Sequence, residues 1–396
     1  MTRDLLDTSK RDAGLDAVRG LAILMVLCTH YFRFSPDTWL WAALNSVFKS
    51  SWLGVDLFFS LSGFLITRIL IQSREQEHYF RNFYARRALR IFPAYYLYLI
   101  FVFFLFENFE LAVSAAELQP WKWPLLCYVQ NIVMTIDGTH MPWRGLDHLW
   151  SLAVEEQFYL FWPLVVFMSP TRLLPRICIA LIALAWICKF VLLAATWKFA
   201  AYGFTVSRLD ALAAGAWIAC WTCSRQSPSD SLPRYARIAS FLAALFLTVH
   251  FVRGRGLGLT TASNIALITS AASLAFAGLI YLVASGNDYP AVKRLFDSRG
   301  LRFLGRYSYG LYLIHIAWAE LALPAVQRWL ESTTGLGDNW VLLISGIAVI
   351  SLAIVNAVVL YHVYEAPILS LKKFFPQPTP SRLALSRSNS ETAVRP

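Results

Sequence analysis

Long apolar runs, separated by short polar segments, set the pattern of this sequence. Most runs contain about 20 residues, the length of helix that crosses the hydrocarbon core of a bilayer. Because backbone polar groups inside a bilayer must be paired within their own segment, each run is expected to form a helix. The pattern predicts an all-α fold, a polytopic transmembrane helix bundle of about ten spans. The expected spans are residues 17–34, 53–72, 88–106, 149–168, 173–196, 206–224, 235–251, 263–285, 303–330 and 339–365.

The composition agrees with this pattern. Of the 396 residues, 57% are apolar and 15% carry a charge, whereas soluble globular proteins have about 25% charged residues. The net charge of +11 does not indicate a nucleic-acid partner, because membrane proteins concentrate lysine and arginine in their cytoplasmic loops. The expected partner is therefore the lipid bilayer, and a homo-oligomer is compatible with the sequence.

The distribution of positive charge predicts the topology. If the N-terminus is cytoplasmic, most lysines and arginines fall in loops on that side, as the positive-inside rule requires. We therefore expect an even number of spans with both termini in the cytoplasm. The chain is expected to divide into a flexible N-terminus (1–13), one membrane domain (14–375) and a disordered tail (376–396), because the tail is rich in proline, serine and arginine.

The six cysteines lie mostly in apolar runs, so they do not indicate a disulfide framework. Cys220 and Cys223 have the spacing of a metal-binding pair, but no histidine or second pair lies near them in the sequence. No metal is therefore expected.

The first span carries an arginine and a histidine near its two ends. Arg19 and His30 are eleven positions apart, which is about 16 Å along a helix axis and close to the same azimuth. An ionisable residue inside a span is costly and suggests a function. The alternative is that Arg19 reaches the membrane surface and that a neighbouring helix pairs with His30.

The predicted topology brings further polar residues to the outer half of the bundle, where His30 lies. These residues come from spans one, two, four and six, and they are His30, Asp56, His148, Ser151, Glu155, Arg208 and Asp210. Asp56 is a candidate partner for His30, because a carboxylate on one imidazole nitrogen raises the basicity of the other. The nearby Ser60, Ser62 and Gly63 are more easily explained by close helix packing.

The fourth span opens with a polar face. His148, Ser151 and Glu155 follow i, i+3, i+7 spacing, and Glu156 lies one position around the helix. One of the two carboxylates is expected to orient His30 or the acceptor. The alternative is an ion pair with Arg208 or Arg144 that holds helices together.

An arginine cluster lies at the cytoplasmic end of the third span. Arg86, Arg87 and Arg90 share helix faces at i, i+3 and i, i+4 spacing. Guanidinium groups bind phosphate through two hydrogen bonds, so the cluster suits a polyphosphate ligand. The alternative is an ordinary positive-inside anchor.

A row of aromatic polar residues opens the ninth span. Tyr309, Tyr312 and His315 follow i, i+3 spacing, and they are expected to line a cofactor tunnel in the cytoplasmic half. The alternative is a belt of interfacial tyrosines. Residues 128–135 are expected to form a re-entrant or interfacial segment, and Glu365 is expected to pair with an arginine of the cytoplasmic cluster.

Taken together, these motifs resemble the membrane acyltransferase family 3, which includes bacterial O-antigen and exopolysaccharide O-acetyltransferases and macrolide acyltransferases. The resemblance covers nearly the whole chain, from residue 14 to about 372. The matching motifs are Arg19-x10-His30, Gly54–Ile66 (GVDLFFSLSGFLI), Arg87–Pro93 (RALRIFP), Trp150–Tyr159 (WSLAVEEQFY), Arg208–Leu212 (RLDAL), Ser308–His315 (SYGLYLIH) and Tyr361–Pro367 (YHVYEAP).

The resemblance implies a donor, an acceptor and a catalytic residue. The donor is acyl-CoA, usually acetyl-CoA, and the acceptor is a hydroxyl of a saccharide or glycan. His30 is implied as the catalytic residue, acting as general base or as acyl acceptor, and Arg87 with Arg90 are implied in donor binding. The expected location is the bacterial cytoplasmic (inner) membrane. Some members carry a C-terminal extracytoplasmic hydrolase-like domain, which this sequence is not expected to contain.

The candidate site residues follow from the motifs and the resemblance together. The catalytic candidates are His30, Asp56 and Glu155. The donor-binding candidates are Arg19, Arg86, Arg87, Arg90, Tyr309, Tyr312 and His315, and the acceptor-binding candidates are His148, Trp150, Ser151, Arg208 and Asp210. One alternative function is acylation of a small secondary metabolite such as a macrolide. A polytopic transporter or flippase is the non-enzyme alternative, although paired broken spans in the two halves are not evident.

Overall fold

The computed structural model describes residues 13–108, 113–138, 140–224, 232–254, 256–258, 262–285 and 290–377, and the regular secondary structure in these ranges is all helical. The predicted all-α fold is confirmed. The predicted flexible segment 1–13, except Ala13, and the predicted disordered tail, except its first two residues, lie outside the described residues.

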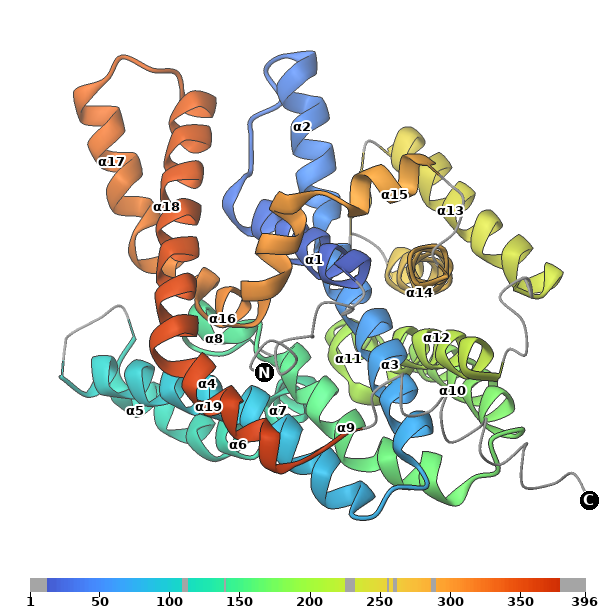
Figure 1. Ribbon diagram of the computed structural model, residues 1–396. Helices are drawn as coiled ribbons and strands as arrows, with labels where there is room; N and C mark the ends of the chain where they lie inside the picture. Colours follow the sequence, from blue (N-terminus) through green and yellow to red (C-terminus); the bar gives the residue numbers. More distant parts are fainter. Residues whose placement is uncertain are drawn as a thin grey trace, which may run out of the picture.

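Ten long helices form most of the described structure (Figure 1). They are α1 (Ala13–Tyr31), α3 (Gly54–Ser73), α4 (Tyr79–Asn108), α9 (Trp150–Met168), α10 (Leu174–Ala194), α12 (Thr205–Ser224), α13 (Arg234–Gly254), α14 (Ala262–Ala284), α16 (Arg299–Leu321) and α18 (Asp338–Leu360). Shorter helices connect or extend them: α2 (Trp39–Ser50), α5 (Ala115–Leu118), α6 (Lys122–Leu126), α7 (Gln130–Asp137), α8 (Arg144–Asp147), α11 (Lys198–Gly203), α15 (Pro290–Phe296), α17 (Leu323–Thr333) and α19 (Ala366–Leu369). The 3-10 turns are η2 (Ser51–Leu53), η3 (Gln119–Trp121) and η5 (Ser370–Phe374), and η4 (Tyr361–Glu365) is a π-helical turn.

Each predicted span coincides with a helix, but fewer than ten helices qualify as spans on their own. Within the described ranges, seven are long and apolar enough to cross a membrane, or eight if the bent pair α16 and α17 is one span. The helices α9 and α12 do not qualify, and both carry charged residues: Glu155 and Glu156 in α9, and Arg208 and Asp210 in α12. The ten-span count and the orientation of the termini remain predictions.

Glycines allow two helix pairs to pack backbone against backbone. A Cβ on Gly63 of α3 would lie 1.9 Å from the carbonyl oxygen of Leu212, and one on Gly215 of α12 would lie 1.8 Å from that of Ser60. Gly20 of α1 and Gly305 of α16 make the same kind of contact between their helices. Since small residues let membrane helices approach closely, these positions fix which faces of the four helices meet. The predicted packing role of Gly63 and Ser60 is confirmed.

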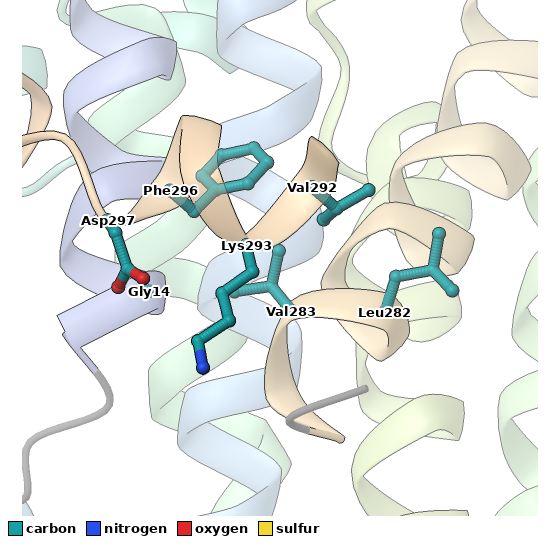
Figure 2. Close-up of a pocket in the computed structure, with 7 residues that line it drawn as sticks. All are labelled: Gly14, Leu282, Val283, Val292, Lys293, Phe296 and Asp297. Atoms are coloured by element: carbon teal, nitrogen blue, oxygen red, sulfur yellow. The ribbon is translucent and has the colours of Figure 1, made fainter. Parts of the chain in front are cut away.

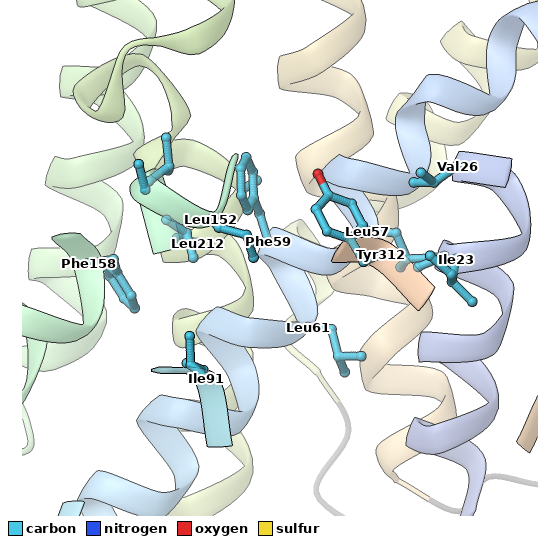
Figure 3. Packing of buried hydrophobic residues seen from close by; sticks show 14 of the residues in the cluster. Ile23, Val26, Leu57, Phe59, Leu61, Ile91, Leu152, Phe158, Leu212 and Tyr312 are labelled. Carbon is cyan, nitrogen blue, oxygen red and sulfur yellow. The ribbon is translucent and has the colours of Figure 1, made fainter. Parts of the chain in front are cut away.

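A hydrophobic core joins the same helices. Figure 3 shows Ile23 of α1, Leu57 of α3 and Tyr312 of α16 lying together, all of them buried. Phe59 and Leu212 meet at a second point of the same cluster. This core holds α1, α3, α12 and α16 as one unit, so polar groups on their facing sides have fixed positions.

The segment between α4 and α9 is broken into short helices that lie beside α4 (Figure 1). The turn between α6 and α7 contains Tyr128, whose φ angle is 55°. Its neighbour Leu125 accepts a hydrogen bond from the hydroxyl of Tyr95 (2.8 Å). Tyr95 is sixteen positions into α4, about 24 Å along the helix axis. The turn is therefore packed against the middle of a long helix, and the re-entrant or interfacial position of residues 128–135 stays a prediction.

Candidate active site

Three imidazole rings lie together in the bundle. His30 is at the end of α1, His315 is in α16 and His148 precedes α9. The ring centroid of His315 is 5.2 Å from that of His30 and 5.0 Å from that of His148. His148 and His315 are buried and His30 is half-buried. We call these residues the histidine cluster. Close packing of α1 on α16 at Gly20 and Gly305 brings His30 and His315 together.

Main-chain carbonyls fix the tautomers of two of the rings. His315 Nδ1 lies 2.7 Å from the Tyr312 carbonyl oxygen, and His148 Nε2 lies 3.1 Å from that of Leu313. Because a carbonyl oxygen only accepts, each of these nitrogens must carry the proton. In the neutral form of each ring, His315 Nε2 and His148 Nδ1 are the unprotonated nitrogens, and both are buried without a hydrogen-bond partner among the described residues. The cluster therefore contains two hydrogen-bond acceptors that are free to bind a hydroxyl or an imidazole N–H.

Tyr312 and Ser151 complete the surroundings of the histidine cluster. The two hydroxyls are hydrogen-bonded to each other, and the Ser151 hydroxyl also lies 3.0 Å from the His148 carbonyl oxygen. The Tyr312 ring centroid is 5.3 Å from that of His148. Tyr309, in contrast, donates to the Ile91 carbonyl (2.6 Å) near the arginines of α4. Tyr312 and His315 therefore lie with His30, whereas Tyr309 contacts α4, and the tunnel-lining role of the row stays a prediction.

Asp56 is paired with Arg208 and not, as the sequence suggested, with His30. Its Oδ1 accepts a hydrogen bond from Arg208 Nη2 at 2.6 Å, and both side chains are fully buried. The guanidinium lies over the rings of Phe59 and Tyr202, at 5.3 and 5.2 Å from their centroids. The Tyr202 ring also contacts Trp150, 5.0 Å between centroids. A buried arginine needs a counter-ion, and Asp56 supplies it.

A second buried ion pair adjoins the first. Lys189 of α10 donates to the carboxylate of Asp210 in α12 and, at 2.8 Å, to the hydroxyl of Thr269 in α14. Both charged side chains are fully buried. Arg208 and Asp210, predicted to bind the acceptor, are thus part of a four-charge network that links α3, α10, α12 and α14. Lys189 was not among the predicted site residues, although a lysine in the middle of an apolar run is a sequence signal for a functional or paired charge.

Glu155 lies at a different level of the bundle from His30. Its Oε1 accepts from the Ser62 hydroxyl (2.9 Å) and its Oε2 from the Tyr159 hydroxyl (2.8 Å). The positive charges that act on it belong to Arg87 and Arg19. Glu155 is seven positions from His148, about 10 Å along the axis. It therefore does not orient His30.

The alternative ion pair for Glu155 is also wrong. Arg208 pairs with Asp56, and Arg144 lies 3.9 Å from Glu320. The two arginines considered for this role therefore bind other carboxylates.

The arginines of α4 have three different surroundings. Arg86 donates to the carbonyl oxygens of Lys372 (3.0 Å) and Phe375 (2.9 Å), which ties α4 to the C-terminal turn. Arg90 lies 3.5 Å from the carboxylate of Glu365, so the structural pairing predicted for Glu365 is confirmed. Arg87 lies over the rings of Phe83 and Tyr159.

Arg19 lies near the same level as Arg87. It forms an ion pair with Asp16 and also acts electrostatically on Glu155. Arg19, Arg87 and Glu155 therefore define one polar level. The histidine cluster defines another, about 10 to 16 Å away by helix rise along α9 and α1.

A cavity of about 170 Å³ lies elsewhere, among α1, α14 and α15 (Figure 2). It is lined by Gly14, Leu282, Val283, Val292, Lys293, Phe296 and Asp297. Gly14 is sixteen positions from His30, about 24 Å along α1, so this cavity is not part of the histidine site. No group of His, Cys, Asp or Glu in the described part of the chain is arranged to hold a metal ion.

Comparison with known proteins identifies the family. The sequence model of a protein family described as an acyltransferase domain matches residues 12–362 of this chain. The peptidoglycan O-acetyltransferase OatA of Listeria monocytogenes is 28% identical over 347 residues, which are 83% of this chain and 52% of the relative. The putative peptidoglycan O-acetyltransferase YrhL of Bacillus subtilis is 31% identical over 340 residues, 79% of this chain and 49% of the relative. The O-acetyltransferase OatA of Staphylococcus aureus is 35% identical over 170 residues, 41% of this chain and 26% of the relative.

The match covers nearly all of the membrane region, but the chain spans about half the length of the first two relatives. No solved structure matches the chain significantly. The family match covers every motif described above except Tyr361–Pro367, of which it includes only Tyr361 and His362. The chain is a polytopic integral membrane protein and belongs to the membrane acyltransferase family 3.

Proposed function

We propose that this protein is a membrane O-acetyltransferase that moves an acetyl group from acetyl-CoA to a hydroxyl of a glycan, of which peptidoglycan is the first candidate. Two relatives that match most of this chain are named peptidoglycan O-acetyltransferases. The observation that carries the proposal is the position of His30 in a cluster with His148 and His315, each of which has one buried ring nitrogen without a partner among the described residues. A macrolide-type acceptor has no comparable support, and the family match argues against the transporter alternative.

The donor is proposed to bind at the arginines of α4. Coenzyme A is polyanionic, so its phosphates would stay with Arg87 and Arg90 while the acyl-bearing arm enters between the helices. The pantetheine arm is roughly 15–20 Å long, and the level of Arg19 and Arg87 is about 10 to 16 Å from the histidine cluster by helix rise. An arm bound in this way would bring its thioester to His30. Arg86, bonded to main-chain carbonyls, is the least available of the three.

His30 is proposed to act as general base. It would take the proton of the acceptor hydroxyl while the hydroxyl oxygen attacks the thioester carbon. A new C–O bond forms, the C–S bond breaks, and the proton on His30 passes to the leaving thiolate. His315 Nε2 and His148 Nδ1 would accept hydrogen bonds from the His30 N–H or from a second acceptor hydroxyl, and so hold the reacting groups in place.

A covalent route uses the same residues. His30 would attack the thioester carbon with its unprotonated nitrogen, the C–S bond would break, and the proton of the other ring nitrogen would go to the leaving CoA thiolate. The acceptor hydroxyl would then attack the acetyl carbon, the C–N bond would break, and the hydroxyl proton would return to the imidazole. Incubating the protein with labelled acetyl-CoA and no acceptor separates the two routes. Label on the His30 peptide supports the covalent route, and unlabelled protein that still transfers acetyl groups to glycan supports the general base.

The central test is substitution of His30. Purified His30→Ala protein should bind CoA normally but transfer no labelled acetyl group to peptidoglycan fragments. His250→Ala is the matched control, because His250 stacks on Phe246 in the peripheral helix α13. Near-normal turnover of the His30→Ala protein would show that His30 is not the catalytic residue. If the wild-type protein labels a small metabolite but no glycan, the acceptor assignment is wrong.

A further inference from the structure

The turn at Tyr128 has an unusual backbone for its position. Tyr128 adopts a φ of 55°, a conformation that is rare and strained for a bulky residue other than glycine. The turn packs against the middle of α4, where the Tyr128 ring stacks on Tyr95 with 4.3 Å between centroids. The strain therefore suggests that this residue has a function.

The hydroxyl of Tyr128 differs from those of its neighbours. Tyr95, Tyr96 and Tyr309 each donate to a main-chain carbonyl oxygen, at 2.8, 3.0 and 2.6 Å. Tyr128 is only 6% exposed, yet its buried hydroxyl has no partner anywhere in the described ranges. Leaving a buried polar group unpaired costs about 1–3 kcal/mol. Three tyrosines thus stabilise the fold, while the fourth keeps a free hydroxyl.

Two further unpaired groups belong to the same cluster. Glu156 interacts electrostatically with Tyr128 and with Arg87. Its Oε1 atom and the Nε of Arg87 are both buried and lack a hydrogen-bond partner among the residues described. The adjacent Glu155, in contrast, accepts two hydrogen bonds. One acceptor and two donors are therefore left unpaired around an aromatic wall formed by Phe92, Tyr95 and Tyr128.

We propose that Tyr128, Glu156 and Arg87 form a subsite for the secondary amide groups of the donor's pantetheine arm. An amide offers a C=O that accepts from the Tyr128 hydroxyl or the Arg87 N–H, and an N–H that donates to the unpaired Oε1 of Glu156. The aromatic wall packs on the apolar parts of the arm. The subsite begins at Arg87, where the proposed function places the phosphates, and extends along α4 toward Tyr95. The inference rests on the proposed function for the identity of the donor.

The test compares two ligands that share the nucleotide end and differ in the arm. CoA carries the pantetheine arm, and adenosine 3′,5′-bisphosphate does not. Binding of both is measured to the full chain in detergent or nanodiscs. Tyr128→Phe keeps the stacked ring and removes only the hydroxyl, so CoA should bind about 3- to 10-fold more weakly, as expected for one lost hydrogen bond. Binding of adenosine 3′,5′-bisphosphate should not change. Glu156→Leu removes the unpaired acceptor oxygen at similar side-chain size, so it should weaken CoA binding to a similar extent.

Tyr96→Phe is the matched control, since the Tyr96 hydroxyl is already bonded to the Leu126 carbonyl. Its CoA affinity should stay within twofold of the wild type. Equal weakening of both ligands by Tyr128→Phe, or no weakening of either, would overturn the subsite. Failure of the wild-type protein to bind either ligand would instead overturn the proposed donor. Thermal unfolding of each variant checks that loss of CoA binding is not loss of the fold.

Discussion

The buried network of Lys189 and Asp210 can be tested by removing its charges singly and together. In the structure both side chains are fully buried, and the ammonium is bonded to the carboxylate and to Thr269. Lys189→Met leaves Asp210 without its direct partner, and Asp210→Asn leaves Lys189 bonded only to neutral groups. Removing one member of a buried pair costs about 3–5 kcal/mol, because the remaining charge is uncompensated.

The double variant Lys189→Met/Asp210→Asn has no uncompensated charge. Replacing both members of a buried pair is often nearly neutral, so the double variant should be at least about 2 kcal/mol more stable than either single variant. The coupling free energy from this double-mutant cycle measures the interaction directly. The assay is reversible unfolding of detergent-purified protein, or the midpoint of thermal aggregation where unfolding is irreversible.

The same cycle decides between a structural and a substrate-binding role for Asp210. If Asp210 is structural, the double variant should retain near-wild-type KM for the acceptor. If Asp210 contacts the acceptor, the double variant should be stable and yet show a raised acceptor KM. Additive losses of stability in the two single variants would refute the structural reasoning, because independent residues show no coupling.

Three further predictions follow from the geometry. Gly215→Ala should destabilise the protein by about 1–3 kcal/mol or prevent its folding, because the new Cβ would lie 1.8 Å from the carbonyl oxygen of Ser60. Gly335→Ala is the control: its Cβ would have no atom within 4 Å, so the unfolding midpoint should not change. Arg90→Ala should raise the KM for acetyl-CoA about 10- to 100-fold with little change in kcat, because one charge-assisted phosphate contact is worth about 1.5–3 kcal/mol. An unchanged KM in steady-state kinetics would remove Arg90 from the donor site. His315→Asn should lower kcat at least tenfold while CoA binding stays normal, because the unpartnered Nε2 beside His30 is lost. A loss of CoA affinity as large as the loss of kcat would instead favour the cofactor-tunnel role predicted from the sequence.

Much of the local structure was readable from the sequence. Apolar runs predicted the positions of the long helices, because a backbone in lipid must pair its own polar groups. The spacing of Arg19 and His30 predicted an axial separation that follows from helix geometry alone. Gly63 was correctly assigned to packing, since a missing side chain in a span allows close approach.

The pairing of polar groups between different helices could not be predicted from the sequence. Asp56 and His30 were expected to meet because both lie near the outer ends of consecutive spans, but Asp56 is paired with Arg208, 152 positions away in the chain. Azimuth and axial level can be calculated for each helix separately. Which faces of two helices meet depends on side-chain packing between the helices, and this cannot be calculated from each helix separately.

The histidine cluster shows the same division. The sequence by itself determined that His30, His148 and His315 would each lie on or beside a helix in an apolar region. Only the tertiary structure decided that they lie together, because the close contact of α1 with α16, set by two glycines, brings segments 285 positions apart to one point. A residue's own helix sets the direction of its side chain, whereas the partner it meets is set by the free energy of packing whole helices against one another.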